Sequence, residues 1–334
     1  GGVRSAASCQ PLRDLIHKAE IPATYTLMAA GVVPYGDPMN IGMVGMHGCY
    51  TSNRAVADCD VLIALGTRFS DRVALNPKTF AKNATIIQID IDPSELGKNV
   101  DVDLSLTGDA SYILQAILPY VEKTEHKVWM EQIRGWQKND YKPVDSDTEL
   151  KPHQIIDEIC SQAGPEAVYV TDVGQHQMWA AQYLHHTKSR GFLTSGGLGT
   201  MGFGYGAAIG AQMALGRDAR VVMLTGDGSF HMNLNEICTA VSYRLPIITV
   251  IMNEKCRKNR SFTPDGLKEL QALHHRVGVC LEQLAMILAE KDLEKRRALC
   301  NTLNNEREAI LRDSYELTLR HRERVSRGLS GAID

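Results

Sequence analysis

The sequence predicts an α/β protein with two doubly wound parallel-sheet domains, the first incomplete at its N-terminus and the second truncated, followed by an α-helical tail. Three observations support this fold class. Short apolar runs rich in valine and isoleucine recur along residues 1–253 and end in glycine or polar residues, as buried parallel strands do. Segments with helical periodicity separate these runs. The residues after 253 instead carry leucines at helical spacing among many charged residues.

The stretch 219–254 organises the prediction. We expect it to contain a buried strand, a glycine-flanked acid, a helix and a second strand, in the order 220–224, 226–228, 234–243 and 247–252. Asn233 or Asn235 is the expected cap of the helix. The strands place Asp227 and Asn253 at their carboxyl ends, where open α/β sheets bind ligands. This edge of the sheet is therefore the predicted site.

Composition sets broad limits on the class of protein. The 334 residues are enough for two domains with their own cores, and a net charge of −3 gives no sign of a nucleic-acid or acidic-substrate partner. No apolar run is long enough to span a membrane, and the start of the chain lacks a signal-peptide pattern. The eight cysteines are scattered without a CxxC pair, so we expect reduced thiols in a cytoplasmic protein rather than disulfides or a zinc site.

Residues 1–145 are predicted to form the first domain. Its expected elements are helix 4–19, strand 21–26, glycine-rich loop 42–48, helix 52–57, strand 61–66, strand 85–91 and helix 110–123. The chain opens on a glycine-rich turn, Gly1–Gly2, and in a doubly wound domain a strand precedes such a turn. We therefore expect this domain to lack its first strand.

Residues 146–253 are predicted to form the second domain, which follows a charged helix and a linker. Its expected elements before the organising stretch are helix 152–162, strand 167–171, strand 191–193 and helix 204–215. Strands again alternate with helices, so a second parallel sheet is predicted.

The motif Gly226-Asp227-Gly228 suits a phosphate and metal site. Two glycines let the backbone approach a ligand closely and leave one carboxylate directed at it. Magnesium prefers oxygen ligands and often bridges a protein carboxylate to phosphate, so Asp227 is a candidate metal ligand and Ser229 a phosphate contact. Taken alone, the motif also occurs as a plain tight loop. Followed by a helix and a polar strand end, it resembles the diphosphate-and-magnesium motif of thiamin-diphosphate enzymes.

A closer resemblance over residues 1–253 rests on six sequence motifs, which occur in this order: GMVGMHG, RFSDRV, IDIDPSELGKN, TDVGQHQMWAAQ, SGGLGTMGFG and GDGSFHMNLNE. They resemble the catalytic subunit of the acetohydroxyacid synthase (acetolactate synthase) family. The resemblance implies condensation of two pyruvates, or of pyruvate and 2-oxobutyrate, with loss of carbon dioxide in branched-chain amino-acid biosynthesis. It also implies thiamin diphosphate, Mg²⁺ and FAD as cofactors, and a homodimer or docking to an intact synthase subunit.

In the first domain the resemblance assigns four residues to FAD: His47, Arg68, Asp90 and Asp109. A loop rich in glycine lets the backbone approach a flat ligand, an arginine can reach a diphosphate, and an acid at a strand end can bind a ribose hydroxyl. Arg72 resembles the arginine that holds the carboxylate of the second oxoacid, for which its planar fork is suited. Taken alone, His47 would be a loop histidine and Arg72 a solvated side chain.

In the second domain the resemblance assigns the thiamin diphosphate contacts: Gly174, Gln175, His176, Gly199, Met201, Gly226, Gly228 and Ser229. Met201 would support the bent cofactor from below, although a lone methionine here would be read as core. The metal ligands would be Asp227, Asn253 and Glu254. Tyr205-Gly206 stands where the family usually has Leu-Pro.

Two departures from the family concern the chemistry. The family's activating glutamate lies in a domain that precedes residue 1, so no residue of this chain is assigned that role. The family pair Asn-Asn is Asn253-Glu254 here, which adds a negative charge beside a diphosphate. Two like charges about 4 Å apart repel by roughly 4 kcal/mol at an effective dielectric of about 20, which Mg²⁺ would offset in part.

The tail 254–334 departs from the synthase pattern. Residues 259–288 resemble the latter half of a MerR-type DNA-binding domain followed by its dimerisation helix, and leucines near heptad spacing over 293–325 suit a two-stranded coiled coil. The first helix-turn-helix of such a regulator is not present, so a basic turn at Arg257, Lys258 and Arg260 is expected to be solvated. The alternative function is therefore a non-catalytic fusion or interaction module that dimerises through this tail.

Overall fold

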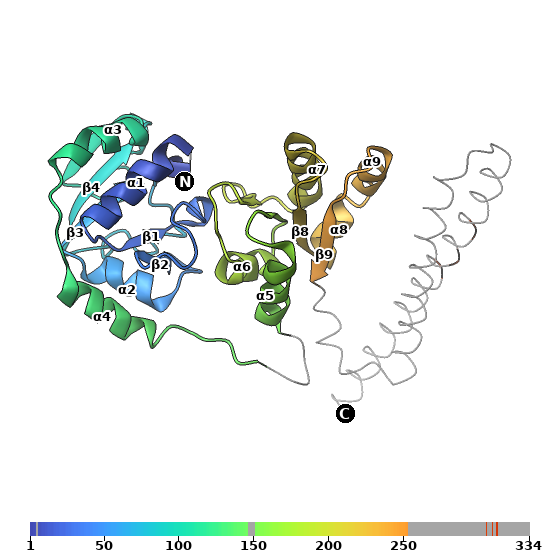
Figure 1. The fold of residues 1–334 in the computed structure, drawn as a ribbon, viewed down its shortest axis with the longest axis horizontal. Coiled ribbons are helices and arrows are strands. Elements are labelled where there is room, and N and C mark those ends of the chain that lie inside the picture. Colours follow the sequence, from blue (N-terminus) through green and yellow to red (C-terminus); the bar gives the residue numbers. More distant parts are fainter. Residues whose placement is uncertain (5, 146–150, 253–304, 306–308, 310–311, 313–334) are drawn as a thin grey trace, which may run out of the picture. The chain divides into compact units, whose positions relative to one another are not determined.

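The computed structural model describes residues 1–4, 6–145 and 151–252, and the single positions 305, 309 and 312. The chain divides into two units at Asn253–Glu254. The helices and strands described below all lie in the first unit, Gly1–Asn253 (Figure 1). The predictions for Asn253, for Glu254 and for the coiled coil and basic turn of the tail fall outside the described residues.

Two parallel sheets lie in the first domain, with strand orders β1-β2 and β3-β4-β5. The strands are β1 (Ala23–Tyr25), β2 (Asn40–Met43), β3 (Val61–Leu65), β4 (Thr85–Asp90) and β5 (Leu104–Thr107). The helices are α1 (Ala6–Lys18), α2 (Tyr50–Asp58), α3 (Ala110–Ile117) and α4 (Lys127–Gln137), and short 3-10 turns include Gly2–Arg4 and Leu27–Ala29. Figure 1 shows the strands between α1 and α3 on one side and α2 and α4 on the other.

The second domain contains one parallel sheet with the strand order β7-β6-β8-β9. Its strands are β6 (Val168–Thr171), β7 (Phe192–Thr194), β8 (Val221–Gly226) and β9 (Ile248–Met252). Its helices are α5 (Pro152–Ala163), α6 (Gln175–Tyr183), α7 (Phe203–Leu215), α8 (Asp227–Met232) and α9 (Glu236–Ser242). Residues 221–224 of β8 are at most 1% exposed, because α6 packs on one face and α7 on the other, as in central parallel strands.

The predicted α/β fold class is confirmed, since every described strand pair is parallel and helices flank the strands. The expected alternation is incomplete in the first domain, because no α-helix lies between β1 and β2, between β3 and β4 or between β4 and β5. Several details of the prediction are wrong. β2 ends within the predicted glycine loop, β5 and α6 were not predicted, and the helix expected at 110–123 ends as α3 at Ile117. The expected turn at 226–228 is instead a strand end followed directly by the unpredicted helix α8, whereas α9 lies within the helix expected at 234–243.

Of the two expected caps, Asn235 is the N-cap residue of α9, although its side chain makes no capping hydrogen bond. Asn233 directs its amide at another element and donates to the backbone oxygen of Gly202. A tertiary contact therefore uses the side chain that local sequence assigned to a cap.

No helix among the described residues combines the length and the apolarity that crossing a lipid bilayer demands.

Direct contacts join the two domains within the first unit. The backbone N–H of Tyr35 donates to the carbonyl of His186 at 2.9 Å, and the Tyr35 ring stacks on His185 with centroids 4.2 Å apart. A Cβ added to Gly31, where φ is +81°, would lie 2.1 Å from the carbonyl oxygen of Lys188. The close contact at Gly31 leaves no room for a side chain, and the stacked rings require matching surfaces, so the two domains pack specifically.

His186 makes stability depend on pH. Burial lowers the pKa of His186 from 6.5 to about 4, since the ring packs against Phe192 and Tyr25. The unfolded chain therefore binds a proton between these two pH values that the folded chain does not, and the free energy of unfolding falls on acidification. From pH 7.5 to 5.5 we expect a loss of about 1.3 kcal/mol from this residue. Urea unfolding at pH 7.5 and 5.5 measures this loss in the free energy of unfolding. If His186→Gln lost as much stability between the two pH values as the parent chain, His186 would not be its source.

Candidate functional site

The strand order of the second domain creates a switch point between β6 and β8. From β6 the chain runs through α6 to β7 on one side, and then through α7 to β8 on the other side of β6. In open α/β sheets, ligands bind outside the carboxyl ends of strands at such a point. The residues that follow β6 and β8 are Asp172–His176 and Asp227–Ser229, and they include most of the residues assigned to thiamin diphosphate.

Asp172 organises the carboxyl end of β6. Its side chain is 1% exposed and accepts backbone hydrogen bonds from Val173 at 2.8 Å, Gly202 at 2.8 Å and Gly204 at 3.1 Å. Gly202 is the N-cap of α7 and has φ of +84°, so the carboxylate satisfies amides at the start of that helix. Asp172 therefore fixes the loop that carries Gly199 and Met201 to the loop that carries Gly174.

His176 lies between the ends of the two strands. Cβ atoms added to Gly174 and Gly226 would each lie 2.9 Å from an atom of its ring, so both glycines make room for the imidazole. His176 is 5% exposed, and its Nε2 has no hydrogen-bond partner among the described residues. Burial lowers the pKa of His176, against smaller opposing effects of Asp172 and Asp227. A buried ring nitrogen without a partner favours a ligand that supplies one.

The start of α8 faces the same edge. Ser229 is 3% exposed and donates its hydroxyl to the backbone oxygen of Val173 at 2.8 Å, which ties α8 to the loop after β6. Gly228 is exposed, and a Cβ there would lie 4.0 Å from the Cε atom of Met201. Met201 itself is 44% exposed, which argues against the core reading. The structure thus brings the 226–229 and 199–201 segments together.

Asp227 is the first residue of α8 and is partly exposed at the strand edge. The other two assigned metal ligands, Asn253 and Glu254, are outside the described residues. Within the part of the chain that is described, no group of three or more histidine, cysteine, aspartate or glutamate side chains is placed to hold a metal. Asp227 is therefore the metal candidate that the described residues offer.

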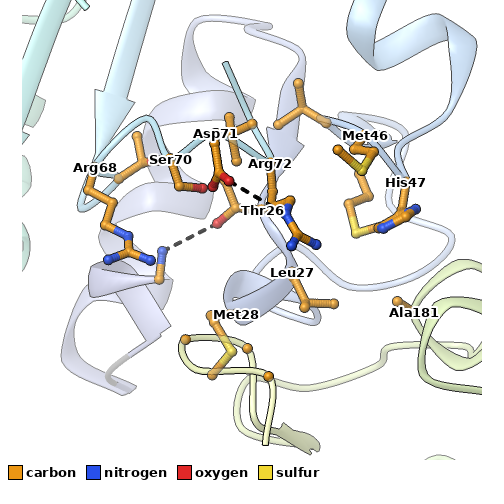
Figure 2. Close-up of a pocket in the computed structure, with 18 of the residues that line it drawn as sticks. Thr26, Leu27, Met28, Met46, His47, Arg68, Ser70, Asp71, Arg72 and Ala181 are labelled. Atoms are coloured by element: carbon orange, nitrogen blue, oxygen red, sulfur yellow. Dashed lines mark hydrogen bonds and ion pairs between the residues drawn. The ribbon is translucent and has the colours of Figure 1, made fainter. Parts of the chain in front are cut away.

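A cavity of about 850 Å³ adjoins the switch point and is lined by both domains (Figure 2). From the first domain it takes His47, Arg68, Arg72 and Asp90, all assigned from sequence. From the second it takes Val173, Gln177, Ala181 and the stretch 195–199, which includes Gly199. Residues far apart in sequence thus meet around one space of the size that organic ligands occupy.

The loop that carries His47 is built around Gly45. The side-chain oxygen of Asn53 in α2 accepts a hydrogen bond from the N–H of Gly45 at 2.9 Å. The side-chain NH₂ of Asn53 donates to the carbonyl oxygen of Gly45 at 3.0 Å. The next amide, that of Met46, donates to the carbonyl of Arg72 at 2.8 Å. Gly45 has φ of +105°, and a Cβ there would lie 2.4 Å from the same Arg72 oxygen. The histidine loop and the arginine loop are therefore fixed to each other through backbone atoms.

The cationic side of the cavity carries two exposed arginines, Arg68 and Arg72. The Nε atom of Arg72 lies 3.7 Å from a carboxylate oxygen of Asp71, and both side chains are more than two-thirds exposed. An exposed ion pair of this kind is weak, so the guanidinium can bind an anionic ligand. Figure 2 shows Arg72 and His47 projecting from first-domain loops, with Ala181 of α6 across from them.

The two assigned acids differ in their surroundings. Asp90 ends β4 and lines the cavity, and its carboxylate accepts the N–H of Asp92 at 3.0 Å. Asp109 is exposed, does not line the cavity, and caps α3 by accepting the N–H of Ser111 at 2.7 Å. Hydrogen bonds from Ser111 hold the pKa of Asp109 below its usual value. The geometry thus supports a ligand role for Asp90 and gives Asp109 a capping role.

Sequence reasoning missed Asp172 and Asn53. Asp172 directly follows a buried strand in the word TDVG, and an acid in that position was a usable signal. Asn53 lies inside a helix, and nothing local indicates that its amide holds the loop at Gly45.

Comparisons with known proteins bear on both domains. Residues 1–117 match the model of the family described as thiamine pyrophosphate enzyme, central domain. Residues 172–261 match that of thiamine pyrophosphate enzyme, C-terminal TPP binding domain. The second match covers Asp172, His176 and the 226–229 segment, so it coincides with the switch point.

Three curated relatives are named as acetolactate synthase large subunits. The chain is 40% identical over 263 residues to the acetolactate synthase large subunit of Buchnera aphidicola subsp. Schlechtendalia chinensis, covering 76% of this chain and 46% of that protein. It is 42% identical over 266 residues to a probable acetolactate synthase large subunit of Methanocaldococcus jannaschii, and the match covers 76% of this chain and 45% of that protein. It is 38% identical over 263 residues to acetolactate synthase isozyme 3 large subunit of Escherichia coli K12, and the match covers 76% of this chain and 46% of that protein.

The chain spans about half the length of the curated relatives it matches. The chain therefore carries a thiamine pyrophosphate enzyme central domain and a C-terminal TPP binding domain, and over both of them it is similar to acetolactate synthase large subunits at about 40% identity.

Proposed function

We propose that this chain supplies the cofactor-holding part of an acetolactate synthase. The reaction is the condensation of pyruvate with pyruvate or 2-oxobutyrate, with loss of carbon dioxide, in branched-chain amino-acid biosynthesis. The observation that carries the proposal is the orphaned Nε2 of His176 at the switch point, beside a cavity lined by His47, Arg68 and Arg72. The proposal assigns no activating glutamate to this chain and places the protein in the cytoplasm, as a homodimer or docked to an intact synthase subunit.

The residues at the switch point fit the diphosphate of thiamin diphosphate. Gly174 and Gly226 keep side chains away from the imidazole, and the N-terminus of α6 directs backbone N–H groups from Gln175 and His176 toward the strand ends. His176 would supply a hydrogen bond, and Gly228 leaves the entry open beside Met201. Gly199 and Met201 would support the thiamin ring. Bound thiamin diphosphate supplies the nucleophilic carbon and electron sink that 2-oxoacid chemistry requires.

Ser229 and Asp227 would act differently from each other. The Ser229 hydroxyl already donates to Val173, so its role is to hold α8 against the loop of the phosphate site. Asp227 would be the charged Mg²⁺ ligand, because its carboxylate is partly exposed at the end of β8. Asn253 and Glu254 would complete the ligand set.

The cavity fits a dinucleotide such as FAD. Arg68 can bind a diphosphate, Asp90 a ribose hydroxyl, and the Gly45–Gly48 loop lets backbone approach a flat ring. Arg72 would hold the carboxylate of the second oxoacid, since a guanidinium pairs with a carboxylate through two hydrogen bonds. Asp109 caps a helix outside the cavity, so its part in FAD binding would be indirect.

The test is calorimetric titration of the purified chain with thiamin diphosphate and Mg²⁺, together with its absorption spectrum for flavin. Because burial keeps the His176 ring neutral near pH 7, binding of an anion beside it should take up a proton. We expect affinity to increase as the pH falls from 8 to 6. His176→Gln should weaken binding about tenfold, which is ~1.4 kcal/mol, and remove this pH dependence.

His126→Gln is the matched control, since His126 is exposed and remote from the switch point in the first domain. It should bind as the parent chain does. Equal affinity and equal pH dependence in His176→Gln and the parent chain would rule out the assignment of His176.

A further inference from the structure

Gln88 of β4 fastens two loops to each other at the carboxyl edge of the β3-β4-β5 sheet. Its side chain is 0% exposed and bonds only to backbone groups of these loops. The side-chain NH₂ donates to the carbonyl of Thr67 at 3.0 Å and to that of Glu95 at 3.1 Å, and the side-chain oxygen accepts the N–H of Gly97 at 2.9 Å. One buried amide therefore holds the loop after β3 against the loop after β4.

Arg68 lies in the first of these loops. A second amide, that of Asn99, donates to the backbone oxygen of Arg68 at 2.7 Å. Gln88 and Asn99 thus bond to neighbouring carbonyls, those of Thr67 and Arg68. The backbone that carries the guanidinium is therefore fixed relative to the loop after β4, although the Arg68 side chain is exposed.

The loop after β4 turns Glu95 back toward the end of the strand. The N–H of Glu95 donates to the carbonyl of Asp92 at 3.1 Å, and the N–H of Asp92 donates to a carboxylate oxygen of Asp90 at 3.0 Å. Gln88 and Asp90 lie two positions apart in β4, so their side chains share one face of the sheet. Because Gln88 also bonds to Glu95, the loop brings Glu95 to the cavity that Asp90 lines, and both acids line it.

The carboxylate of Glu95 has only one of its two oxygens bonded. Oε1 accepts a hydrogen bond from the ammonium group of Lys98 at 2.7 Å, whereas Oε2 is buried and has no hydrogen-bond partner among the described residues. A buried acceptor without a donor is unfavourable, and a ligand that brings a donor removes this cost. Lys98 is 53% exposed and its ion pair is therefore weak, so the carboxylate can turn toward such a donor.

The surroundings narrow the donor to the hydroxyl of a nucleotide sugar. Arg68 offers a cation for a diphosphate, and Asp90 at its strand end offers an acceptor for one ribose hydroxyl. Ribose carries two adjacent hydroxyls, and a second carboxylate on the same cavity suits the other one. The cavity is also lined by Arg72, and two arginines disfavour a cationic ligand for these acids.

We propose that Glu95 and Asp90 form a pair of acceptors for the two adjacent hydroxyls of the adenosine ribose of the dinucleotide that the cavity binds. Gln88 is the positioning residue that holds this pair beside the loop of Arg68. The proposal rests on the proposed FAD role of the cavity and adds Glu95, which the sequence motifs do not assign. It also restricts the ligand to a ribonucleotide, because a deoxy sugar leaves one carboxylate without its donor.

The experiment titrates the full chain with FAD and with FAD analogues that carry 2′-deoxyadenosine or 3′-deoxyadenosine, and follows the flavin fluorescence. We expect the parent chain to bind each analogue about tenfold more weakly than FAD, which is ~1.4 kcal/mol for one lost hydrogen bond to a carboxylate. Glu95→Met keeps the length of the side chain without a strong acceptor. It should bind FAD about tenfold more weakly than the parent chain and no longer discriminate against one of the two analogues.

Two further variants make the result specific. Glu95→Gln keeps one acceptor oxygen and should retain part of the affinity and of the discrimination. Glu125→Met is the matched control, because Glu125 also pairs with a lysine of the first domain, Lys127 at 2.6 Å, but lies outside the lining of the cavity. It should bind all three ligands as the parent chain does, and its Tm should equal that of Glu95→Met.

The outcomes separate this proposal from the function on which it rests. If Glu95→Met binds FAD as tightly as the parent chain, or discriminates against both analogues as strongly, the assignment of Glu95 is overturned while the FAD role of the cavity stands. If the parent chain binds none of the three ligands, the FAD role and the ribose pair are both refuted.

Discussion

Replacing Asp172 with alanine is expected to lower the free energy of unfolding by about 3 kcal/mol or more and to abolish binding of thiamin diphosphate. The change leaves the amides of Val173, Gly202 and Gly204 without their acceptor in a site that is 1% exposed. A hydrogen bond to a charged group contributes about 1.5–3 kcal/mol, and an unsatisfied buried amide costs about 1–3 kcal/mol. Urea unfolding measures the stability, and titration calorimetry measures the binding.

Asp172→Asn provides the graded version of this test. Asparagine keeps one acceptor oxygen for Val173 and Gly202 but places an NH₂ group near the amide of Gly204, so we expect an intermediate loss. Asp218→Asn is the control, because Asp218 is exposed after α7. Stability of Asp172→Ala within about 0.5 kcal/mol of the parent chain would show that the carboxylate does not organise the site.

Replacing Gly45 with alanine is expected to destabilise the first domain by more than about 3 kcal/mol and to weaken the proposed flavin binding at least tenfold. The new Cβ would lie 2.4 Å from the carbonyl oxygen of Arg72 at a backbone φ of +105°. Relief requires the His47 loop to move away from the Arg72 loop, and both line the cavity. Denaturation and flavin absorbance give the two readouts.

Gly36→Ala separates the two causes. Gly36 also has a left-handed φ, +85°, but nothing lies within 4 Å of its Cβ position. Its substitution should cost only the conformational penalty of about 1–2 kcal/mol and leave flavin binding unchanged. If the two variants lose the same stability, the close approach of Gly45 to Arg72 contributes nothing.

The fold was predictable where burial dominates. β8 is apolar on both faces and reads as a strand from composition alone, as do β3 and β4. β5 was missed although Leu104-Ser105-Leu106-Thr107 alternates in the manner of a half-covered strand. β2 was not predicted as a strand because it contains Gly42, and a glycine inside a short apolar segment is more typical of a loop.

Long-range contacts decided what local sequence could not. α8 begins at Asp227 between two glycines, and the Ser229 bond to Val173 and the Asn233 bond to Gly202 hold it in place. Asp227 and Gly226 were placed at the correct sheet edge because strand ends are visible in the sequence. That the Arg72 carbonyl holds the His47 loop depends on two segments that meet only in the fold, so no local pattern could indicate it.

The fastening of Asp140 to α2 sets how far the two domains can separate. Both carboxylate oxygens of Asp140 accept hydrogen bonds from Thr51, at 2.8 Å each, and the next tie in the chain is the 2.8 Å hydrogen bond between Asp145 and His153 of α5. The four residues between these two ties let the Cα atoms of Asp140 and Asp145 separate by at most about 18 Å. A tether of that reach corresponds to an effective concentration on the order of millimolar. The Tyr35–His185 stack therefore needs only modest affinity, and weakening it alters how often the domains part rather than whether they meet again.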